Sequence, residues 1–287
     1  MVTTNFNYGD YLEDCMSSII SSPGSERVDY VVMDGGSTDG SVEIIKKYEP
    51  HLKHWQSEKD DGMYHAIEAG FAHSNAPYMG WLNSDDKLAP WAIQTVLDIF
   101  DQLPQVRWIT SRFPMQATKA GVPMMTRIMP AADKWGFFNG EHIRTSTGPS
   151  TGWIVQDCTF WRRDLWEEAG GRFDRSLKLA ADFELWARFM LCAELYMVPT
   201  PLGIYRVQGE NKAMAAAEAY RDECVKVLER HRGVVEEDPE LLSERVIYKK
   251  MMSVGLGKLV TKSKRPIMKL ISYNHDKGRY EAQDQNT

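Results

Sequence analysis

Residues 28–40 of this chain read VDYVVMDGGSTDG. The first six residues, Val28 to Met33, are nearly all apolar or β-branched, which predicts a strand covered on both faces. The next seven, Asp34 to Gly40, are typical of a turn, and residues 41–48 then have helical spacing. A strand, a turn and a helix in this order indicate an α/β fold with a mostly parallel sheet.

The same alternation continues along the chain. Asp34 comes directly after the first predicted strand, and the pair Asp85-Asp86 comes soon after an apolar run that ends at Leu82. In an open α/β sheet the ligand crevice lies at the carboxyl ends of the strands, so these acids are expected to meet at one site although about 50 residues separate them. The further predicted strands span 52–57, 77–82 and 106–113, and the further helices span 62–74 and 90–103.

The second half of the chain is less regular. Residues 114–152 are rich in Gly, Pro, Thr and Met, and two interpretations stay open: an insertion beside the site, or a connection with a short helix at 135–142. We expect an α/β domain over residues 1–210 and a C-terminal helical extension with a basic, then polar, tail over residues 211–287. Strands are predicted over 153–161, 195–198 and 202–206, and helices over 163–169, 180–191 and from 213 to about 260, broken near Asp238-Pro239.

Composition limits the possible classes of protein. The chain has 287 residues, 43% of them hydrophobic, which suits one or two globular domains. A net charge of -6 argues against an extended nucleic-acid interface, so we expect no nucleic-acid partner. Without a membrane-spanning apolar run or a signal-peptide pattern, a cytoplasmic protein is expected. Its four cysteines, far apart and without a CxxC pair, are expected to be reduced thiols.

The adjacent acids Asp85 and Asp86 predict a metal site. Two carboxylates at the end of a buried strand repel each other unless a cation neutralises them, and oxygen ligands suit a hard divalent ion such as Mg²⁺ or Mn²⁺. Such an ion usually binds phosphates as well. Together with the Asp34–Gly40 turn, the pair therefore suggests an enzyme that acts on a nucleotide-linked substrate.

Asp182 opens the stretch Ala181–Trp186, within the helix predicted over 180–191, and is the candidate general base. Residues four apart on a helix share a face, so Asp182 and Trp186 are expected to line one wall. Glu184 points elsewhere and is expected to be a supporting residue.

Each acidic motif also has a purely structural interpretation. The Asp34–Gly40 turn can cap a helix, Asp85-Asp86 can cap the helix that begins near Pro90, and Asp182 can be a first-turn acid favoured by the helix dipole. Five apolar residues are expected in the core rather than at a substrate: Phe160, Trp161, Trp166, Leu185 and Phe189.

Taken together, these motifs resemble those of family 2 glycosyltransferases, over about residues 1–210. The resemblance implies a GT-A fold, that is, a Rossmann-like α/β/α sandwich with a mostly parallel central sheet, here followed by C-terminal helices. The segments that match are Val2–Asn7, Asp34–Gly40, Glu58–Ile67, Leu82–Asp86, Gln156–Arg163 and Ala181–Trp186.

The resemblance also implies roles for individual residues on the donor side. Thr4, Phe6 and Asp34 would hold the base and ribose, with Phe6 as the stacking face. Asp61 would contact the nucleotide, and Asp85 would bind the ribose and the metal.

Asp86 would bind the metal and the diphosphate with Asp85, and Asp182 would be the catalytic base. The chain departs from the family pattern at five positions, of which Asn83 bears on the metal site because it replaces the first acid of the usual DxD motif. The others are Gly35, Glu68, Ala181 and Gln208.

The function that follows is sugar transfer with inversion, assisted by a divalent metal, from a nucleotide-sugar donor, with a UDP-sugar favoured. The acceptor would be a hydroxyl group on a glycan, a polysaccharide or a lipid-linked sugar. Two rivals remain: a catalytically silent nucleotide-sugar-binding partner, and a nucleotidyltransferase, whose basic triphosphate loop is not visible here. The basic residues from Lys262 to Lys269 are expected to form a solvated tail or to dock at an anionic membrane surface.

Overall fold

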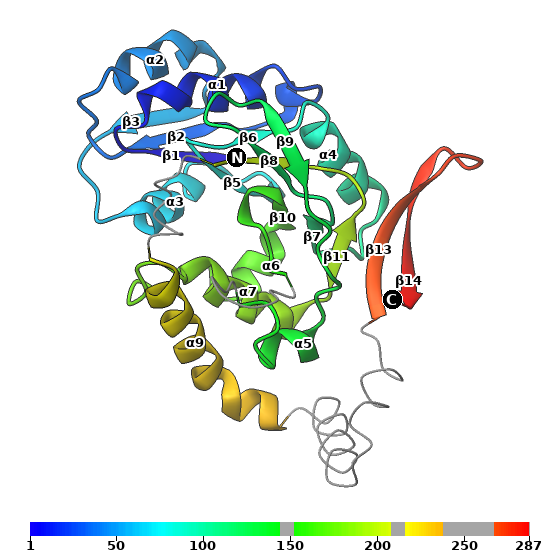
Figure 1. Ribbon diagram of the computed structural model, residues 1–287. Helices are drawn as coiled ribbons and strands as arrows, with labels where there is room; N and C mark the ends of the chain where they lie inside the picture. Colours follow the sequence, from blue (N-terminus) through cyan, green and yellow to red (C-terminus); the bar gives the residue numbers. More distant parts are fainter. Residues whose placement is uncertain (144–151, 208–215, 238–266, 287) are drawn as a thin grey trace, which may run out of the picture.

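The computed structural model of the chain describes residues 1–143, 152–207, 216–237 and 267–286 (Figure 1). Strands and helices alternate through the first half, and three sheets form the frame of the molecule. The predicted α/β class is therefore confirmed.

The first sheet is parallel throughout, with the order β3-β2-β1-β5. Asn5 lies opposite Asp34, and Thr4 lies opposite Asn83, so three strands end at the same edge. This is the edge at which the sequence predicted a ligand site. The strands are β1 (Val2–Asn5), β2 (Val31–Asp34), β3 (His54–Ser57) and β5 (Trp81–Asn83).

Helices lie on both sides of this sheet (Figure 1). Alternate side chains of its strands pack against the helices of opposite sides. Val32 belongs to the apolar cluster of α1 and α2, whereas Val31 and Met33 belong to that of α3. Gly70 allows α3 to lie close to the sheet, because a Cβ atom there would come within 2.7 Å of Val2 Cγ1. The helices are α1 (Gly9–Ile20), α2 (Ser41–Tyr48), α3 (Met63–Phe71) and, between β6 and β7, α4 (Ala92–Gln102).

The second sheet is mixed, with the order β14-β13-β11-β7-β10-β4. The single strand predicted over 77–82 is wrong, since β4 pairs with β10 in this sheet and β5 pairs with β1 in the first. The chain passes from one sheet to the other at Gly80, where a Cβ atom would lie 2.8 Å from the ring of Phe160. The strands are β4 (Tyr78–Met79), β7 (Trp108–Ser111), β10 (Thr159–Arg162), β11 (Leu195–Val198), β13 (Ile267–Asn274) and β14 (Arg279–Asn286).

The irregular stretch that begins at residue 114 contains both a hairpin and a short helix. Strands β8 (Met115–Ala117) and β9 (Pro123–Thr126) form the hairpin, and α5 (Lys134–Phe138) follows it. The stretch thus has features of both interpretations that the sequence left open, an insertion and a connection with a short helix. The hairpin belongs to a third sheet, β6-β12-β8-β9, completed by β6 (Lys87–Leu88) and β12 (Gly203–Arg206).

The strand predicted over 153–161 is wrong for its first six residues. Gln156–Cys158 form a single 3-10 turn, and only Thr159–Arg162 pair as β10. The reason is the close passage of β12, since a Cβ atom at Gly203 would lie 2.4 Å from the carbonyl oxygen of Asp157. The remaining helices are α6 (Arg163–Glu168), α7 (Ala181–Cys192) and α9 (Ala217–Glu237).

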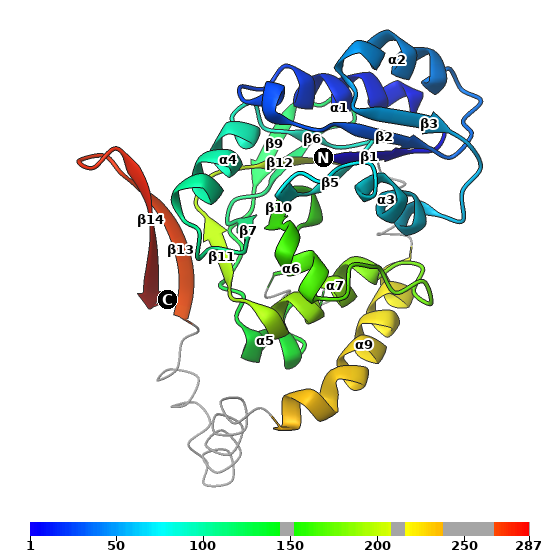
Figure 2. The same ribbon diagram turned by 180° about the vertical axis from the view of Figure 1, so that it is seen from behind.

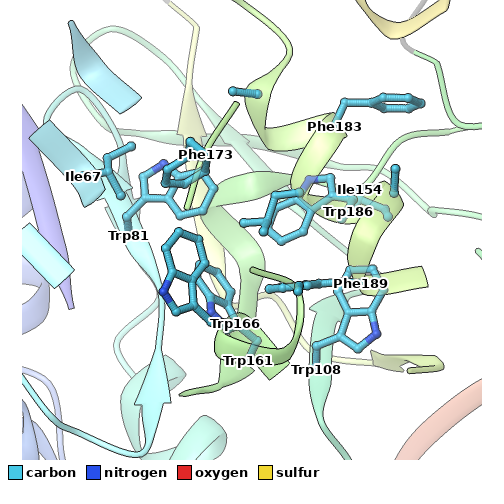
Figure 3. Packing of buried hydrophobic residues seen from close by; sticks show 14 of the residues in the cluster. Ile67, Trp81, Trp108, Ile154, Trp161, Trp166, Phe173, Phe183, Trp186 and Phe189 are labelled. Carbon is cyan, nitrogen blue, oxygen red and sulfur yellow. The ribbon is translucent and has the colours of Figure 1, made fainter. Parts of the chain in front are cut away.

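A cluster of tryptophans joins the first sheet to α7 (Figure 3). The ring of Trp186 on α7 stacks on Trp81 of β5 at 5.8 Å and on Trp108 of β7 at 5.8 Å. Trp161 packs edge-on against both Trp81 and Trp186. Large aromatic rings are stiff and bury much apolar area, so this cluster fixes α7 relative to β5. The five residues predicted to be core, Phe160, Trp161, Trp166, Leu185 and Phe189, are all buried.

The C-terminal residues form a hairpin, not a solvated tail. Strand β13 pairs in parallel with β11 and antiparallel with β14, and it buries Met268 and Ile271 (Figure 2). The solvated-tail prediction for Lys262–Lys269 is therefore wrong for its described residues 267–269, which belong to β13, where apolar and polar residues alternate as in a half-buried strand. Residues 238–266, with the part of the predicted helical segment after residue 237 and the basic Lys262–Arg265, lie outside the described residues. The domain boundary at residue 210 stays a prediction.

None of the helices in the described part of the chain has both the length and the apolar character needed to cross a membrane.

Ile271→Ala tests whether this hairpin is part of the folded core. Ile271 is fully buried, and removing its side chain should lower the free energy of unfolding by about 2–5 kcal/mol. Urea denaturation measures the change. Tyr273→Ala on the same strand is the control, since that side chain is 46% exposed and should have a much smaller effect. Equal stability of the Ile271 and Tyr273 variants would show that β13 is not docked.

Candidate functional site

A cavity of about 530 Å³ lies at the carboxyl edge of the first sheet. Its walls come from the end of β1, the start of α3, the loop after β5, the β8–β9 hairpin, residues 153–157, and the helices α7 and α9. This is the place where open α/β sheets bind ligands, and the volume suits a small organic molecule. Four of the predicted site residues and the candidate base line it: Thr4, Phe6, Asp85, Asp86 and Asp182.

Asp34 lies beneath the cavity rather than in its wall. Its carboxylate is only 2% exposed and accepts hydrogen bonds from Asn5 Nδ2 (2.7 Å), Ser37 Oγ (2.6 Å) and Ser57 Oγ (2.6 Å). Burial acts to raise the pKa of Asp34, but the hydrogen bonds from Ser37 and Ser57 outweigh it and hold the pKa below its ordinary value. Asp34 therefore ties β1, β3 and the turn after β2 together as an anion.

The neighbouring donor-side residues are placed differently. Phe6 is 56% exposed and presents its ring to the cavity beside Thr4. Asp60, and not Asp61, is among the residues that line the cavity, and Asp60 Oδ1 accepts a hydrogen bond from Gly62 N. An exposed aromatic ring beside a cavity is suited to stacking on a nucleobase.

The two adjacent acids have different surroundings. Asp85 is partly exposed to the cavity, whereas Asp86 is 1% exposed and its Oδ1 accepts a hydrogen bond from the backbone N–H of Arg206 (2.7 Å). The carboxyl of Asp86 also hydrogen-bonds that of Asp157, which is buried as well. Two carboxyl groups can hydrogen-bond only when one holds a proton. Burial, the first cause for both groups, raises the pKa of Asp86 and raises that of Asp157 to about 7.

The carboxylate oxygens at the cavity are suitable ligands for a hard divalent cation. Among the described residues no cluster of three or more His, Cys, Asp and Glu side chains is arranged to hold a metal ion. Asp85 and Asp86 nevertheless supply carboxylate oxygens at the cavity, and Mg²⁺ is commonly held by one or two carboxylates together with substrate phosphates. The repulsion among Asp85, Asp86 and Asp157 is relieved by a shared proton or by a bound cation.

The candidate base, Asp182, sits in the first turn of α7. Its Oδ1 accepts a hydrogen bond from Phe183 N (2.8 Å). The hydroxyl of Tyr64 donates to the carbonyl oxygen of Leu179 at 2.9 Å and lies 3.4 Å from Asp182 Oδ1. Because a hydroxyl has one proton, the shorter bond to Leu179 takes it. Burial raises the pKa of Asp182 to about 6, so the carboxyl is a stronger proton acceptor than an exposed aspartate.

The loop before Asp182 is held by a residue of α9. The carboxylate of Glu223 accepts hydrogen bonds from the backbone N–H groups of Lys178 (3.1 Å), Leu179 (2.9 Å) and Ala180 (2.9 Å). These groups precede α7 directly, so Glu223 caps the helix that carries the base. A helix beyond the predicted catalytic domain thus fixes the position of the candidate base.

The other predictions on α7 have mixed outcomes. Glu184 does support the helix, since both its carboxylate oxygens accept hydrogen bonds from Arg188, at 2.7–3.0 Å. The prediction that Trp186 lines the wall with Asp182 is wrong, because the ring is 1% exposed and packs in the tryptophan cluster. Residues four apart share a face of a helix, but this face runs from the cavity into the core.

The sequence did not identify three residues that shape the site. Asp157 had a detectable signal, a lone acid within the apolar stretch 153–161. Tyr64 lies in the matched segment Glu58–Ile67 but was given no role, and Glu223 had no signal, since each acts through a contact more than 40 residues away in the chain.

Comparisons with known proteins agree with this geometry. The chain matches glycosyl transferase family 2 over residues 1–169, which confirms the predicted resemblance. An uncharacterized glycosyltransferase of Mycobacterium tuberculosis is 34% identical over 89 residues, which are 31% of this chain and 34% of the relative. One from Rickettsia prowazekii is 21% identical over 220 residues, which are 76% of this chain and 67% of the relative. The match thus spans about a third of the length of the mycobacterial protein.

Solved structures show the same fold at low identity. Residues 1–349 of TarS from Staphylococcus aureus, in complex with UDP-GlcNAc, align with a TM-score of 0.57 and 15% identity, covering 99% of this chain and 96% of that one. The mannosyltransferase PcManGT from Pyrobaculum calidifontis, in complex with GDP-Man and Mn²⁺, aligns with a TM-score of 0.54 and 14% identity, covering 92% and 80%. These likenesses confirm the predicted GT-A fold class.

Proposed function

We infer the activity of this chain from its family and its cavity: the chain belongs to glycosyl transferase family 2. We propose that it transfers a sugar from a nucleoside diphosphate to a hydroxyl acceptor, with inversion at the anomeric carbon. The observation that carries this proposal is that Asp85, Asp86 and Asp182 line one cavity, although they come from distant parts of the chain. A leaving-group site and a base are then present within reach of one substrate.

On the donor side, the proposal assigns Phe6 to stacking on the base and Thr4 to contacting the nucleoside. Asp34 keeps its proposed role in donor binding. Because its carboxylate accepts hydrogen bonds from Ser37, this role would be to hold the turn after β2 in place for the donor. Asp61 stays a proposed nucleotide contact, with Asp60 beside it in the cavity wall. A UDP-sugar is the favoured donor, because TarS was solved with UDP-GlcNAc, and GDP-Man, the donor with PcManGT, is the alternative.

On the diphosphate side, Asp85 and Asp86 would hold the divalent cation, Mn²⁺ or Mg²⁺. The ion, when bound, neutralises charge that grows on the departing diphosphate. PcManGT was solved with Mn²⁺, which supports a metal in this family fold. Asp157 would keep Asp86 oriented from behind, since the two carboxyls are hydrogen-bonded.

On the acceptor side, Asp182 would take the proton from the attacking hydroxyl. Glu223 fixes the loop before the base, and Tyr64 fixes the same loop through Leu179. An attack from the face opposite the leaving diphosphate inverts the anomeric configuration in a single displacement. The acceptor proposed is a hydroxyl group on a glycan or on a lipid-linked sugar.

The rate of transfer should fall on the acid side of about pH 6, because Asp182 must be ionised to accept a proton and burial raises its pKa to about 6. Below that pH the ionised fraction falls roughly tenfold per pH unit. Initial rates at saturating donor, measured from about pH 5 to about pH 8, test this prediction. Donor binding by calorimetry over the same range is the control, since burial raises the pKa of Asp157, near the proposed metal ligands, to about 7. A pH-independent rate would contradict the assignment of Asp182.

A panel of nucleotide sugars tests the proposed function as a whole. Each UDP- and GDP-sugar is added with Mn²⁺, and the melting temperature is measured, since a ligand of the folded state raises it. A donor that gives a shift is then incubated with a hydroxyl acceptor, and NMR identifies the product anomer. Binding without turnover would show a silent binder, and a product with retained configuration would exclude the single displacement.

A further inference from the structure

The β8–β9 hairpin carries an apolar surface that the fold leaves uncovered. All four residues of β9 are exposed, so both faces of this edge strand are open to solvent (Figure 1). The hairpin surface consists of Val122, Met124, Met125 and Ile128, which are 49–71% exposed. Single exposed apolar residues are common, but four within seven positions, two on an edge strand and two beside its ends, mark an interaction site.

Every charged residue within the hairpin segment is positive, and the acid beside its turn at Gly121, Asp14 of α1, is ion-paired with Lys87 (3.3 Å) and Arg206 (3.1 Å). Residues 112–132 contain three cations and no Asp or Glu, although the whole chain carries 40 acids and a net charge of -6. Two of these cations, Lys119 and Arg127, are exposed. Arg127 lies over the ring of Trp153 (5.7 Å) and Lys119 over the ring of Tyr11 (6.0 Å), so both are held beside the apolar residues.

The hairpin surface is also close to the candidate active site. Met115 and Gln116 of β8, with Arg127 and Met129 after β9, line the cavity. The hairpin is anchored by pairing of β8 with β12, in which Met115 lies opposite Ile204. A partner bound to the hairpin surface would therefore lie at the mouth of the cavity.

We propose that the hairpin surface docks on an anionic lipid bilayer and presents the cavity to a lipid-borne hydroxyl acceptor. Apolar side chains enter the boundary between headgroups and acyl chains, while Lys119 and Arg127 contact acidic headgroups. The identity of the acceptor rests on the proposed glycosyl transfer, but the docking itself does not.

A bilayer fits the hairpin surface better than a second copy of the chain. Four half-exposed side chains offer on the order of 400 Å², about half of the ~800 Å² per partner in a stable interface. Within the basic segment Lys262–Lys269, the described cation Lys269 offers little to an acidic surface. Lys269 forms ion pairs with Glu194 (3.2 Å) and Asp284 (3.0 Å), so the charge of Lys269 is already neutralised.

Sedimentation with vesicles tests the proposal. The full chain is mixed, without donor, with vesicles of phosphatidylcholine or of phosphatidylcholine with about a third phosphatidylglycerol. We expect binding to the acidic vesicles that weakens in high salt. Met124→Ser with Met125→Ser should lower the partition coefficient roughly tenfold or more, and Lys119→Gln roughly fivefold. Val234→Ser on α9 is the matched control, because Val234 is 56% exposed and lies outside the hairpin.

Because Met124 and Met125 are half-exposed, the double variant should have the melting temperature of the wild type and should still bind nucleotide. No binding of the wild type to acidic vesicles would overturn the proposal. So would equal binding by wild type and the double variant, or loss of binding only on replacing Lys262, Lys264 and Arg265. A wild-type dimer that the double variant abolishes, without vesicle binding, would show instead an interface between copies.

Failure of docking and failure of the proposed function give different results. Vesicle binding with no turnover of any nucleotide sugar would leave docking intact and refute the glycosyl transfer. Transfer to a soluble acceptor with no vesicle binding would support the glycosyl transfer and refute the docking.

Discussion

Asp182→Asn should lower the rate of sugar transfer by roughly 10²–10⁴ while donor affinity changes by less than a few-fold. The substitution keeps the side-chain volume and the acceptor for the Phe183 N–H group, and it removes the basic carboxylate. A base that acts only on the acceptor contributes to the transition state and not to binding of the donor. Steady-state kinetics with a competent acceptor and calorimetry with the nucleoside diphosphate measure the two quantities.

Asp164→Asn is the matched control for this substitution. Asp164 lies in the first turn of α6, as Asp182 lies in that of α7, but it is exposed and does not line the cavity. If Asp182 serves only the helix dipole, the two variants should lose similar, small amounts of stability and both should keep their activity. Unchanged transfer in Asp182→Asn would remove Asp182 as the base.

Part of this site could be predicted from the sequence because its signals are local. Asp34 and Asp85 each follow an apolar run, and parallel strands place such ends together at one edge. Asp182 is a first-turn acid of a helix whose register was visible in the spacing of apolar residues. A strand followed by a turn and a helix is specified within about 20 residues, so its place in the fold depends little on the rest of the chain.

The rest could not be predicted, because it depends on contacts that have no local pattern. Glu223 holds the loop before α7 from a helix more than 40 residues downstream, and nothing in the sequence around it distinguishes it from the other acids of that helix. Strand β13 was missed for a related reason. Its side chains alternate, but the partner strand β11 lies some 70 residues earlier, and basic flanking residues favoured a tail. Gly80 marks the change between two sheets only through its contact with Phe160.

The same dependence on distant contacts decides which of the two adjacent acids can be changed without changing the fold. Asp86 accepts a hydrogen bond from the Arg206 backbone and interacts with the buried carboxyl of Asp157, so a variant at Asp86 disturbs β12 and the segment before β10 as well. Asp85 faces the cavity and is partly exposed. Asp85 is therefore the position at which metal binding can be tested with the least structural change.

Asp85→Asn should remove most of the increase in nucleoside diphosphate affinity that Mn²⁺ produces. An amide oxygen is a weaker ligand than a carboxylate, and even a lost partner behind a metal ligand costs roughly 10- to 100-fold in metal affinity. Calorimetry with UDP gives, for each protein, the ratio of the dissociation constant without Mn²⁺ to the dissociation constant with Mn²⁺. In the wild type this ratio should be large, and in Asp85→Asn it should approach one.

Asp60→Asn is the control for charge alone, since Asp60 also lines the cavity but is not one of the proposed ligands. Loss of the Asp60 charge should change the affinity for UDP by the same factor with and without Mn²⁺, because this charge acts on the anionic ligand in both cases. Coordination by a ligand residue, in contrast, acts only when the ion is present. A ratio in Asp85→Asn equal to that of the wild type would exclude Asp85 as a ligand, and equal losses in Asp85→Asn and Asp60→Asn would reduce its role to electrostatics.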